Sequence, residues 1–363
     1  MIKKSTIISR KILIAPLNWG LGHATRCIPI VNALQEVGFE PVIAGDGDSL
    51  LLLQKEFPGL KSFELPSYNI RYTKTGSLLK YRLLLQYYSI LRAVREEQEV
   101  VHKIIDKENI VGIISDNRFG VRSHKIPSVY ITHQVNVLSG SSTFLTSKFH
   151  QKIISKFDEC WIPDFQGKAN LSGKLSYIEQ PKLNLKFIEP LSRFKERIKS
   201  PKKYDLMVLI SGPEPQRTIL EKKLFKELEY TNKEVIFIKG IISKKQKFER
   251  KNNITIVNFM LQDELQKAIT ESDIVIARSG YSTIMDLQKL KARAFFIPTP
   301  GQAEQEYLAK HLSGQNIAPY VYQNDFKLGD LERVNSFKGF KGFNTGSEFD
   351  FKGLFKIFDS ADQ

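Results

Sequence analysis

Cysteine and long apolar runs are both scarce in this chain. Only Cys27 and Cys160 are present among 363 residues, and they form no CxxC motif. This spacing indicates neither a disulfide framework nor a zinc or redox pair. The apolar stretches, such as 50–53 and 83–85, fall short of the roughly 18–20 residues that cross a bilayer. We therefore expect a cytoplasmic protein with buried cysteines and exclude an integral membrane protein with spanning helices.

The composition is that of a globular protein with a basic surplus. Apolar residues make up 42% of the chain and charged residues 26%, and the length predicts about two domains. Fifty-four Lys and Arg against 39 Asp and Glu give a net charge of +15, which suggests an anionic partner. No RNA-binding or helix-turn-helix signature accompanies the basic stretches, so we expect no nucleic-acid partner.

Short apolar segments alternate with helical patterns in two successive blocks. In a chain of this kind, nearly continuous apolar strands predict parallel sheets covered by helices on both faces. The expected strands are residues 11–15, 41–44, 110–115, 128–132, 205–210, 234–238, 254–257, 274–277 and 294–297, and the expected helices 24–37, 49–57, 217–228, 261–268, 281–290 and 303–312.

The two blocks predict an α/β protein made of two Rossmann-like domains that face a cleft. We expect an N-terminal domain over residues 1–190, a linker over 191–203 and a C-terminal domain over 204–335. Residues 336–363 contain a repetitive Phe-Lys-Gly run and form either a flexible tail or an ordered crossing segment. Ligands of such sheets bind at the carboxyl ends of the strands, so both sets of ends should border the cleft.

The loop over residues 20–23 follows the first strand and opens the first helix, where backbone amides can hold a phosphate. A dinucleotide-binding fingerprint requires a third glycine where Thr25 stands, which disfavours an NAD-dependent oxidoreductase. His23 is a candidate acid or base at neutral pH and Arg26 a candidate anion ligand, although His23 could also simply cap the helix.

A pair of carboxylates, Asp46 and Asp48, has the spacing by which sugar transferases hold a divalent ion. A turn followed by a helix N-cap explains the same residues. No other cluster of metal ligands is present in the sequence, so we expect no metal.

Polar residues follow two consecutive strands of the second block. Arg278, Ser279 and Gly280 end one strand, and Thr283 and Asp286 lie on the next helix. A carboxylate in this place suits a ribose diol, and amides at the helix start suit a diphosphate.

Residues 278–286 (RSGYSTIMD) and 297–307 (IPTPGQAEQEY) resemble the donor-binding half of GT-B glycosyltransferases of family 28, which includes the MurG-like N-acetylglucosaminyltransferases. The likeness extends loosely to about residue 325. It implies inverting transfer of a hexose or N-acetylhexosamine from a nucleotide-diphosphate sugar, with UDP the expected nucleotide, to a hydroxyl acceptor. The acceptor would be a small molecule or lipid-linked, and no cofactor would be required.

The resemblance also implies roles for single residues. Asp286 stands in the place of the family's ribose-binding Glu, and loop 211–216 matches the family's Gly-Gly-Ser-Gln-Gly-Ala loop in part, with two prolines instead of flexible positions. The expected donor-binding residues are Ser211, Gly212, Gln216, Phe259, Met260, Arg278, Ser279, Gly280, Thr283, Asp286, Gln305 and Glu306.

On the acceptor side, loop 20–23 looks like the family's GxGGH loop, and residues 132–134 resemble its His-Glu-Gln-Asn segment with the Glu out of register. His23 is the first candidate for the group that engages the acceptor, with His133 and Asp116 as alternatives. The expected acceptor-binding residues are Gly20, Gly22, Arg26, His133 and Gln134.

Two further readings stay open. The segment 71–95 interleaves basic and apolar residues and would suit either peripheral contact with an anionic membrane or a buried helix. Residues 20–27 also look like nucleotide-sugar hydrolases of the pseudaminic-acid pathway, in which the His activates water, and binding without turnover is not excluded by the sequence.

Overall fold

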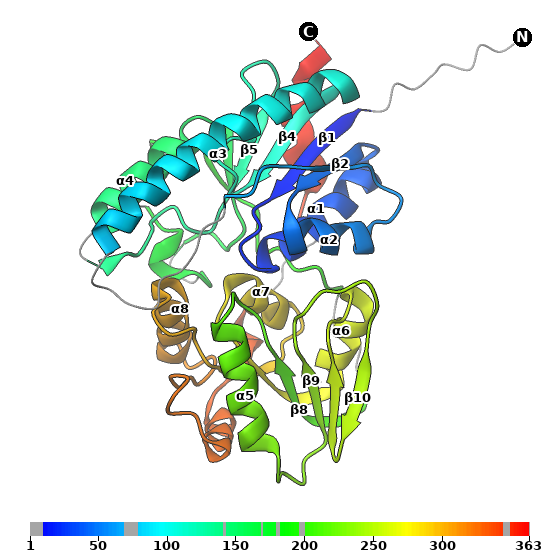
Figure 1. Cartoon of the computed structure of the whole chain (residues 1–363), viewed down its shortest axis with the longest axis vertical. Helices are drawn as coiled ribbons and strands as arrows, with labels where there is room; N and C mark the ends of the chain where they lie inside the picture. The colour runs from blue at the N-terminus through cyan, green and yellow to red at the C-terminus, as the bar shows by residue number, and fades with distance from the viewer. Residues whose placement is uncertain are drawn as a thin grey trace, which may run out of the picture.

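The computed structural model describes residues 10–68, 79–140, 143–167, 170–178, 182–195, 200–343 and 349–362, with side chains described from residue 90 onward in the helix that starts at residue 79. The chain forms two α/β halves, one above the other in Figure 1, each built on its own sheet. The predicted fold class, two Rossmann-like halves, is confirmed.

The N-terminal half has a seven-stranded, wholly parallel sheet in the order β3-β2-β1-β4-β5-β6-β7. Its central strands are buried because they are short apolar runs covered on both faces. The strands are β1 (Lys11–Pro16), β2 (Glu40–Gly45), β3 (Ser62–Glu64), β4 (Ile110–Asp116), β5 (Ser128–Ile131), β6 (Glu159–Ile162) and β7 (Leu185–Phe187). The helices are α1 (Gly22–Val37), α2 (Gly47–Glu56), α3 (Leu79–Glu108), α4 (Thr143–Ile154) and the short η2 (Gly173–Leu175).

The C-terminal half has a six-stranded sheet in the order β10-β11-β9-β8-β12-β13. The sequence predicted parallel strands, and the exception is β10, an exposed edge strand that runs antiparallel to β11. The strands are β8 (Tyr204–Leu209), β9 (Val235–Ile238), β10 (Phe248–Lys251), β11 (Ile254–Val257), β12 (Ser272–Ala277) and β13 (Arg293–Phe296). The helices are α5 (Gln216–Leu228), α6 (Gln262–Thr270), α7 (Tyr281–Lys289), α8 (Ala303–Gly314), η3 (Leu328–Ser336) and η4 (Gly339–Gly342).

The end of the chain returns to the N-terminal half, as the red segment of Figure 1 shows. The short helices α9 (Phe351–Leu354) and η5 (Phe355–Asp362) pack beside α1 and β4. Phe355 and Phe358 are buried there against Phe39 and Trp161. Arg10 donates to Asp359 at 2.8 Å. Of the two alternatives for residues 336–363, the described part is an ordered crossing segment, and 344–348 lie outside the described residues.

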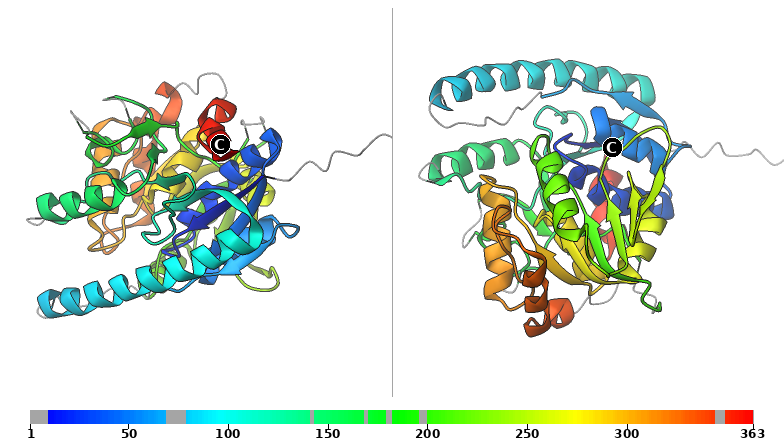
Figure 2. Two further views of the ribbon diagram at one scale, coloured as in Figure 1. Left: turned by 90° about the horizontal axis from the view of Figure 1, so that it is seen from above. Right: turned by 60° about the horizontal axis from the view of Figure 1, so that its bottom comes forward.

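The carboxyl ends of both sheets face the junction of the two halves. Helix α1 of the N-terminal half packs directly on α7 of the C-terminal half. Ser282, at the start of α7, donates to the backbone oxygen of Gly22 at 2.7 Å. Figure 2 shows α3 and α4 extending to the same side of the N-terminal half. The loops that follow the strands of both halves are thereby brought to one place.

Candidate functional site

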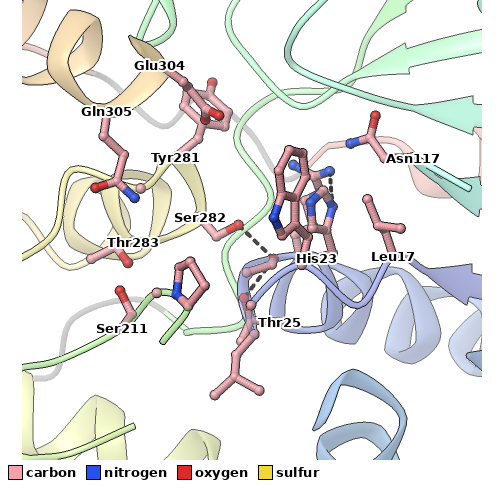
Figure 3. Close-up of a pocket in the computed structure, with 18 of the residues that line it drawn as sticks. Leu17, His23, Thr25, Asn117, Ser211, Tyr281, Ser282, Thr283, Glu304 and Gln305 are labelled. Carbon is pink, nitrogen blue, oxygen red and sulfur yellow. Dashed lines mark hydrogen bonds between the residues drawn. The ribbon is translucent and has the colours of Figure 1, made fainter. Parts of the chain in front are cut away.

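A cavity of about 600 Å³ lies between the two halves and is lined by both. Its N-terminal wall comes from the loops after β1, β4 and β5 and from α4, and its C-terminal wall from the loops after β8, β9, β11 and β12 and from the start of α8. Figure 3 shows His23 and Asn117 on one side and Ser211, Thr283 and Gln305 on the other. The structure thus brings together loops that are more than 250 residues apart in sequence.

The N-terminal wall is built around a buried carboxylate, Asp116, at the end of β4. Both Asp116 oxygens accept hydrogen bonds from the Arg26 guanidinium, and Oδ1 lies 2.8 Å from Nδ1 of His23. Burial by itself raises the pKa of Asp116, but Arg26 and His23 outweigh it and lower the pKa to about 2. Asp116 is therefore an anion next to His23, and its low pKa makes it a weaker base than a histidine near pH 7.

His23 lies in the first turn of α1, directly after the glycine-containing turn. Gly20 adopts a positive φ of 78° that a side chain would strain, and this turn sets the direction in which α1 begins. Nδ1 of His23 lies 2.8 Å from Asp116 Oδ1 and 2.7 Å from Arg26 Nη2, so the ring is held by this nitrogen between the two groups. Burial lowers the pKa of His23, partly offset by Asp116. A neutral imidazole can accept a proton.

A second histidine joins the two halves. Nδ1 of His133 lies 3.1 Å from Arg26 Nη1, and Nε2 lies 2.8 Å from Oε1 of Glu304 on α8. Gln134 donates to the other oxygen of Glu304. The His133 ring stacks on Tyr281 with centroids 4.2 Å apart and planes at 9°. His133 and Gln134, both predicted on the acceptor side, thus lie at the cavity and are held partly by the C-terminal half.

Four functional candidates in this region were missed by sequence reasoning: Asn117, Tyr281, Ser282 and Glu304. Asn117 follows β4 with φ at +56°, a conformation that non-glycine residues seldom adopt, and it lines the cavity. The signal available in the sequence was its place after a strand next to Asp116. The other three became visible only through the packing of the halves, because their partners lie more than 100 residues away.

On the C-terminal wall, the structure places most of the predicted donor-binding residues at the cavity. Asp286 is almost fully buried, with Oδ1 accepting from Ser192 at 2.9 Å and Oδ2 from Arg193 at 3.2 Å. Burial raises the pKa of Asp286, and Arg193 and Ser192 counter the rise. The predicted donor residues on this wall are Ser211, Gly212, Phe259, Met260, Gly280, Thr283, Asp286 and Gln305, and the predicted acceptor residues on the opposite, N-terminal wall are Gly20, Gly22, Arg26, His133 and Gln134 together with His23.

Four predicted donor residues do not line the cavity. Arg278 is fully buried and donates to the carbonyl oxygens of Ile297, Pro298 and Gln216 and to the Gln323 side chain at 2.6–3.1 Å, so it lies behind the cavity wall, and its contact with a diphosphate stays a prediction. The remaining three are likewise engaged within the protein. Ser279 donates to the backbone oxygen of Gln305, Glu306 accepts from the amide of Gly301, and Gln216 accepts from Arg278 and Gln323.

The two carboxylates after β2 have different surroundings in the structure. Asp46 is buried and accepts from Arg118 at 2.6 Å and from Asn18 at 3.1 Å, whereas Asp48 is exposed in the first turn of α2. Arg118 is itself buried and paired with Glu97. Asp46 stands at the N-cap position without a side-chain cap bond. In the described part of the chain, no group of three or more His, Cys, Asp or Glu side chains is arranged to hold a metal.

The outer rim of the N-terminal wall is apolar. Along α4, the exposed fraction falls from 70% at Leu145 through 47% at Phe149 to 7% at Ile153, and all three line the cavity. Of the segment 71–95, residues 71–78 lie outside the described residues, and the side chains of 79–89 are not described. None of the helices in the described ranges combines the length and apolar character needed to cross a membrane.

Comparison with known proteins identifies the class of enzyme. Residues 215–335 match the family model of the glycosyltransferase family 28 C-terminal domain. The chain is 22% identical over 335 residues to the UDP-N-acetylglucosamine–N-acetylmuramyl-(pentapeptide) pyrophosphoryl-undecaprenol N-acetylglucosamine transferase of Haemophilus ducreyi, covering 90% of this chain and 89% of that protein. It is 27% identical over 322 residues to an uncharacterized glycosyltransferase of Methanosarcina acetivorans, covering 82% and 81%.

Solved structures agree on the fold. The glycosyltransferase SnogD from Streptomyces nogalater superposes with a TM-score of 0.57 at 13% identity, covering 97% of this chain and 94% of that one. The glycotransferase of kitacinnamycin superposes with a TM-score of 0.59 at 12% identity, with the same coverage. The chain is a nucleotide-sugar glycosyltransferase of the GT-B fold that resembles family 28, and none of these matches supports the hydrolase alternative.

Proposed function

We propose that this glycosyltransferase binds a UDP-sugar in its C-terminal half and transfers the sugar, with inversion, to a hydroxyl group held against its N-terminal half. The observation that carries the proposal is the shared cavity, in which the Asp116–His23 pair faces the loops around Gly280 and Thr283. The choice of UDP and of N-acetylglucosamine as the first sugar to test rests on the printed activity of relatives such as the Haemophilus ducreyi enzyme.

In the proposed reaction, His23 is the general base. This step requires the tautomer in which Nδ1–H donates to Asp116, 2.8 Å away, and Nε2 takes the proton of the acceptor hydroxyl as the oxygen attacks the anomeric carbon. The bond from that carbon to the diphosphate breaks, and the nucleoside diphosphate leaves with the electron pair. Amides at the start of α7, where Gly280 is the N-cap, are placed to stabilise its charge.

Asp286 is proposed to bind the ribose of the donor. It lies at the cavity wall between α7 and the linker, and a carboxylate can accept hydrogen bonds from both hydroxyls of a ribose. Ser192 and Arg193 hold it in place from the linker side. Phe259 and Met260, which also line the wall, are proposed to contact the base.

The side chains of α4 favour a lipid-bearing acceptor at a membrane surface. The apolar stripe Leu145–Phe149–Ile153 runs from the surface into the cavity, and Phe144 beside it is 70% exposed. The exposed Lys148 and Lys152 lie on the same helix, and the exposed Lys156 follows its end at Ile154. Apolar side chains next to lysines suit the interface of an anionic bilayer. We propose that the enzyme contacts the membrane peripherally through α4.

The donor assignment is tested by a thermal-shift panel of UDP-, GDP- and dTDP-N-acetylglucosamine on the wild type and on Asp286→Ala. We expect a UDP-sugar to raise the melting temperature of the wild type and to leave that of Asp286→Ala nearly unchanged. Asp273→Ala, which removes an exposed partner of Arg293 in the same half, is the matched control and should keep the wild-type shift. An equal shift in Asp286→Ala would remove this carboxylate from the donor site.

The membrane proposal has its own test. Flotation with vesicles of phosphatidylglycerol and phosphatidylcholine should recover the wild type, and Leu145→Asp should reduce the recovered fraction. Tyr230→Asp, which changes an 89% exposed aromatic residue of the other half, is the control and should float like the wild type. Equal flotation of Leu145→Asp and the wild type would contradict membrane contact through α4.

Free sugar released from the donor without any acceptor would indicate hydrolysis instead of transfer.

A further inference from the structure

An unbroken set of hydrogen bonds crosses the cleft at one point. It starts at Glu304 in the first turn of α8 and passes through His133 and Arg26 to Asp116 and His23. Only Glu304 belongs to the C-terminal half. Three of its neighbours, Arg26, Asp116 and His133, are almost completely buried, so each has a single set of partners in this arrangement.

The donor and acceptor roles along these contacts are fixed by chemistry. Arginine can only donate, so Nδ1 of His133 must accept from Arg26 Nη1, and the proton of a neutral His133 then lies on Nε2. That proton points at the carboxylate of Glu304, 2.8 Å away. A carboxylate can only accept, and Gln134 donates to its second oxygen. Glu304 therefore selects one tautomer and one ring orientation of His133.

The same contacts reach the candidate base. Arg26 donates to Asp116 from one edge of its guanidinium and to His133 from the other. These bonds hold the guanidinium in one orientation. Asp116 Oδ1 and Arg26 Nη2 in turn lie 2.8 Å and 2.7 Å from Nδ1 of His23 and hold its ring. When the halves separate, His133 loses both Glu304 and the stacked ring of Tyr281.

We propose that Glu304 is a positioning residue that links closure of the two halves to the orientation of the base: from α8 it fixes His133, and through Arg26 and Asp116 it holds the His23 ring by its Nδ1 edge. The role of His23 in this statement rests on the proposed function. The same face of α8 makes further contacts, because Tyr307 and His311, three and seven residues further on, also contact the N-terminal half at the amide of Lys174 and the backbone oxygen of Asn170. Glu304 is thus part of a continuous interface between the halves.

The charges around the two groups give a readout that a purely structural role would not move. His23 is surrounded by Asp116 from β4, Arg26 from α1, His133 from the loop after β5 and, at longer range, Glu304 from α8. Burial raises the pKa of Glu304, but His133, His23 and Arg26 lower it by more than burial raises it. The group is therefore a carboxylate. Its negative charge raises the pKa of His23 in return. Removing the charge should lower the pKa of His23.

The experiment is a titration of the side-chain nitrogens of all six histidines by NMR in the wild type and in Glu304→Gln. In the wild type we expect His133 as the Nε2–H tautomer. In Glu304→Gln one carboxylate oxygen becomes an NH₂ group, which faces either the N–H of His133 or the amide N–H of Gln134. We therefore expect a mixed tautomer at His133 and a downward shift in the pKa of His23. Glu304→Asp keeps the charge on a side chain that is shorter by one methylene. It should give a His133 tautomer ratio and a His23 pKa between those of the wild type and Glu304→Gln. Glu332→Gln, an exposed acid of the same half, is the control.

Activity supplies a second readout, with UDP-N-acetylglucosamine as the probe and released UDP as the signal. We expect kcat of Glu304→Gln to fall about tenfold or more while KM for the donor stays unchanged, because the lost bond aligns the base rather than binding the donor. A His23 that titrates at the wild-type pH in Glu304→Gln, with His133 still a single tautomer, would overturn the proposal. If no UDP-sugar binds, the proposed function fails, but the NMR result still decides the role of Glu304.

Discussion

Replacing Asp116 by Asn tests the centre of the N-terminal wall. The pKa of Asp116 is lowered from 3.8 to about 2 against the effect of burial, chiefly by Arg26 and then by His23. This difference corresponds to about 2 kcal/mol of stability at neutral pH. Asn also leaves the buried Arg26 without its anion, and breaking a buried pair in this way costs about 3–5 kcal/mol in total. For a domain of this size the melting temperature should fall by about 10 °C.

The measurement is differential scanning calorimetry of Asp116→Asn beside Asp48→Asn, an exposed acid of the same half that should change the melting temperature by about 2 °C or less. Because the folded state binds the Asp116 proton more weakly than the unfolded state, its contribution is complete above pH 3.8 and is lost as the pH falls to about 2. The wild type and Asp116→Asn should therefore converge in acid. An equally small change in both variants at neutral pH would refute the view that this ion pair supports the wall.

Two other changes probe the cleft and the loop after β12. A Cβ at Gly22 would meet the Ser282 side chain at 3.0 Å, so Gly22→Val should hold the halves apart, raise the radius of gyration in solution scattering and lower kcat about 100-fold, with partial recovery in Gly22→Val/Ser282→Gly. Arg278→Met should destabilise the C-terminal half by about 3 kcal/mol in urea unfolding, because several buried oxygens lose their donor. Its affinity for a UDP-sugar, measured by calorimetry, should change less than about threefold; a large loss of affinity with normal stability would return Arg278 to the diphosphate site.

The strand-to-helix loops could be predicted because their signals are local. The apolar run 11–15 and the helix over 24–37 correspond to β1 (Lys11–Pro16) and α1 (Gly22–Val37), and the loop between them carries His23 at the cavity. The same reasoning located Asp286 on a helix that follows a buried strand. In each case the residue's neighbours along the chain decide both its structure and the edge of the sheet at which it lies.

Residues whose role depends on the packing of the two halves could not be predicted. Glu304 looks like an acidic residue in the first turn of a helix, and nothing near it in sequence indicates His133 as its partner. The same holds for Arg278, because its position after a strand suits an anion site, and only the packed structure shows that its guanidinium is engaged by carbonyl groups. The end of the chain was ambiguous for the same reason: Phe355 and Phe358 find their core beside Phe39, more than 300 residues away.

The distribution of charge around the cavity decides where the donor diphosphate can lie. With neutral histidines, Asp116 and Glu304 against Arg26 leave the acid–base side with a net negative charge. A diphosphate placed there would be repelled by this negative charge. At the amino end of α7 the diphosphate instead meets first-turn backbone amides, and Arg193 is a nearby cation on that wall. The charges thus favour a bound sugar whose anomeric carbon faces His23 while its leaving group points away from Glu304.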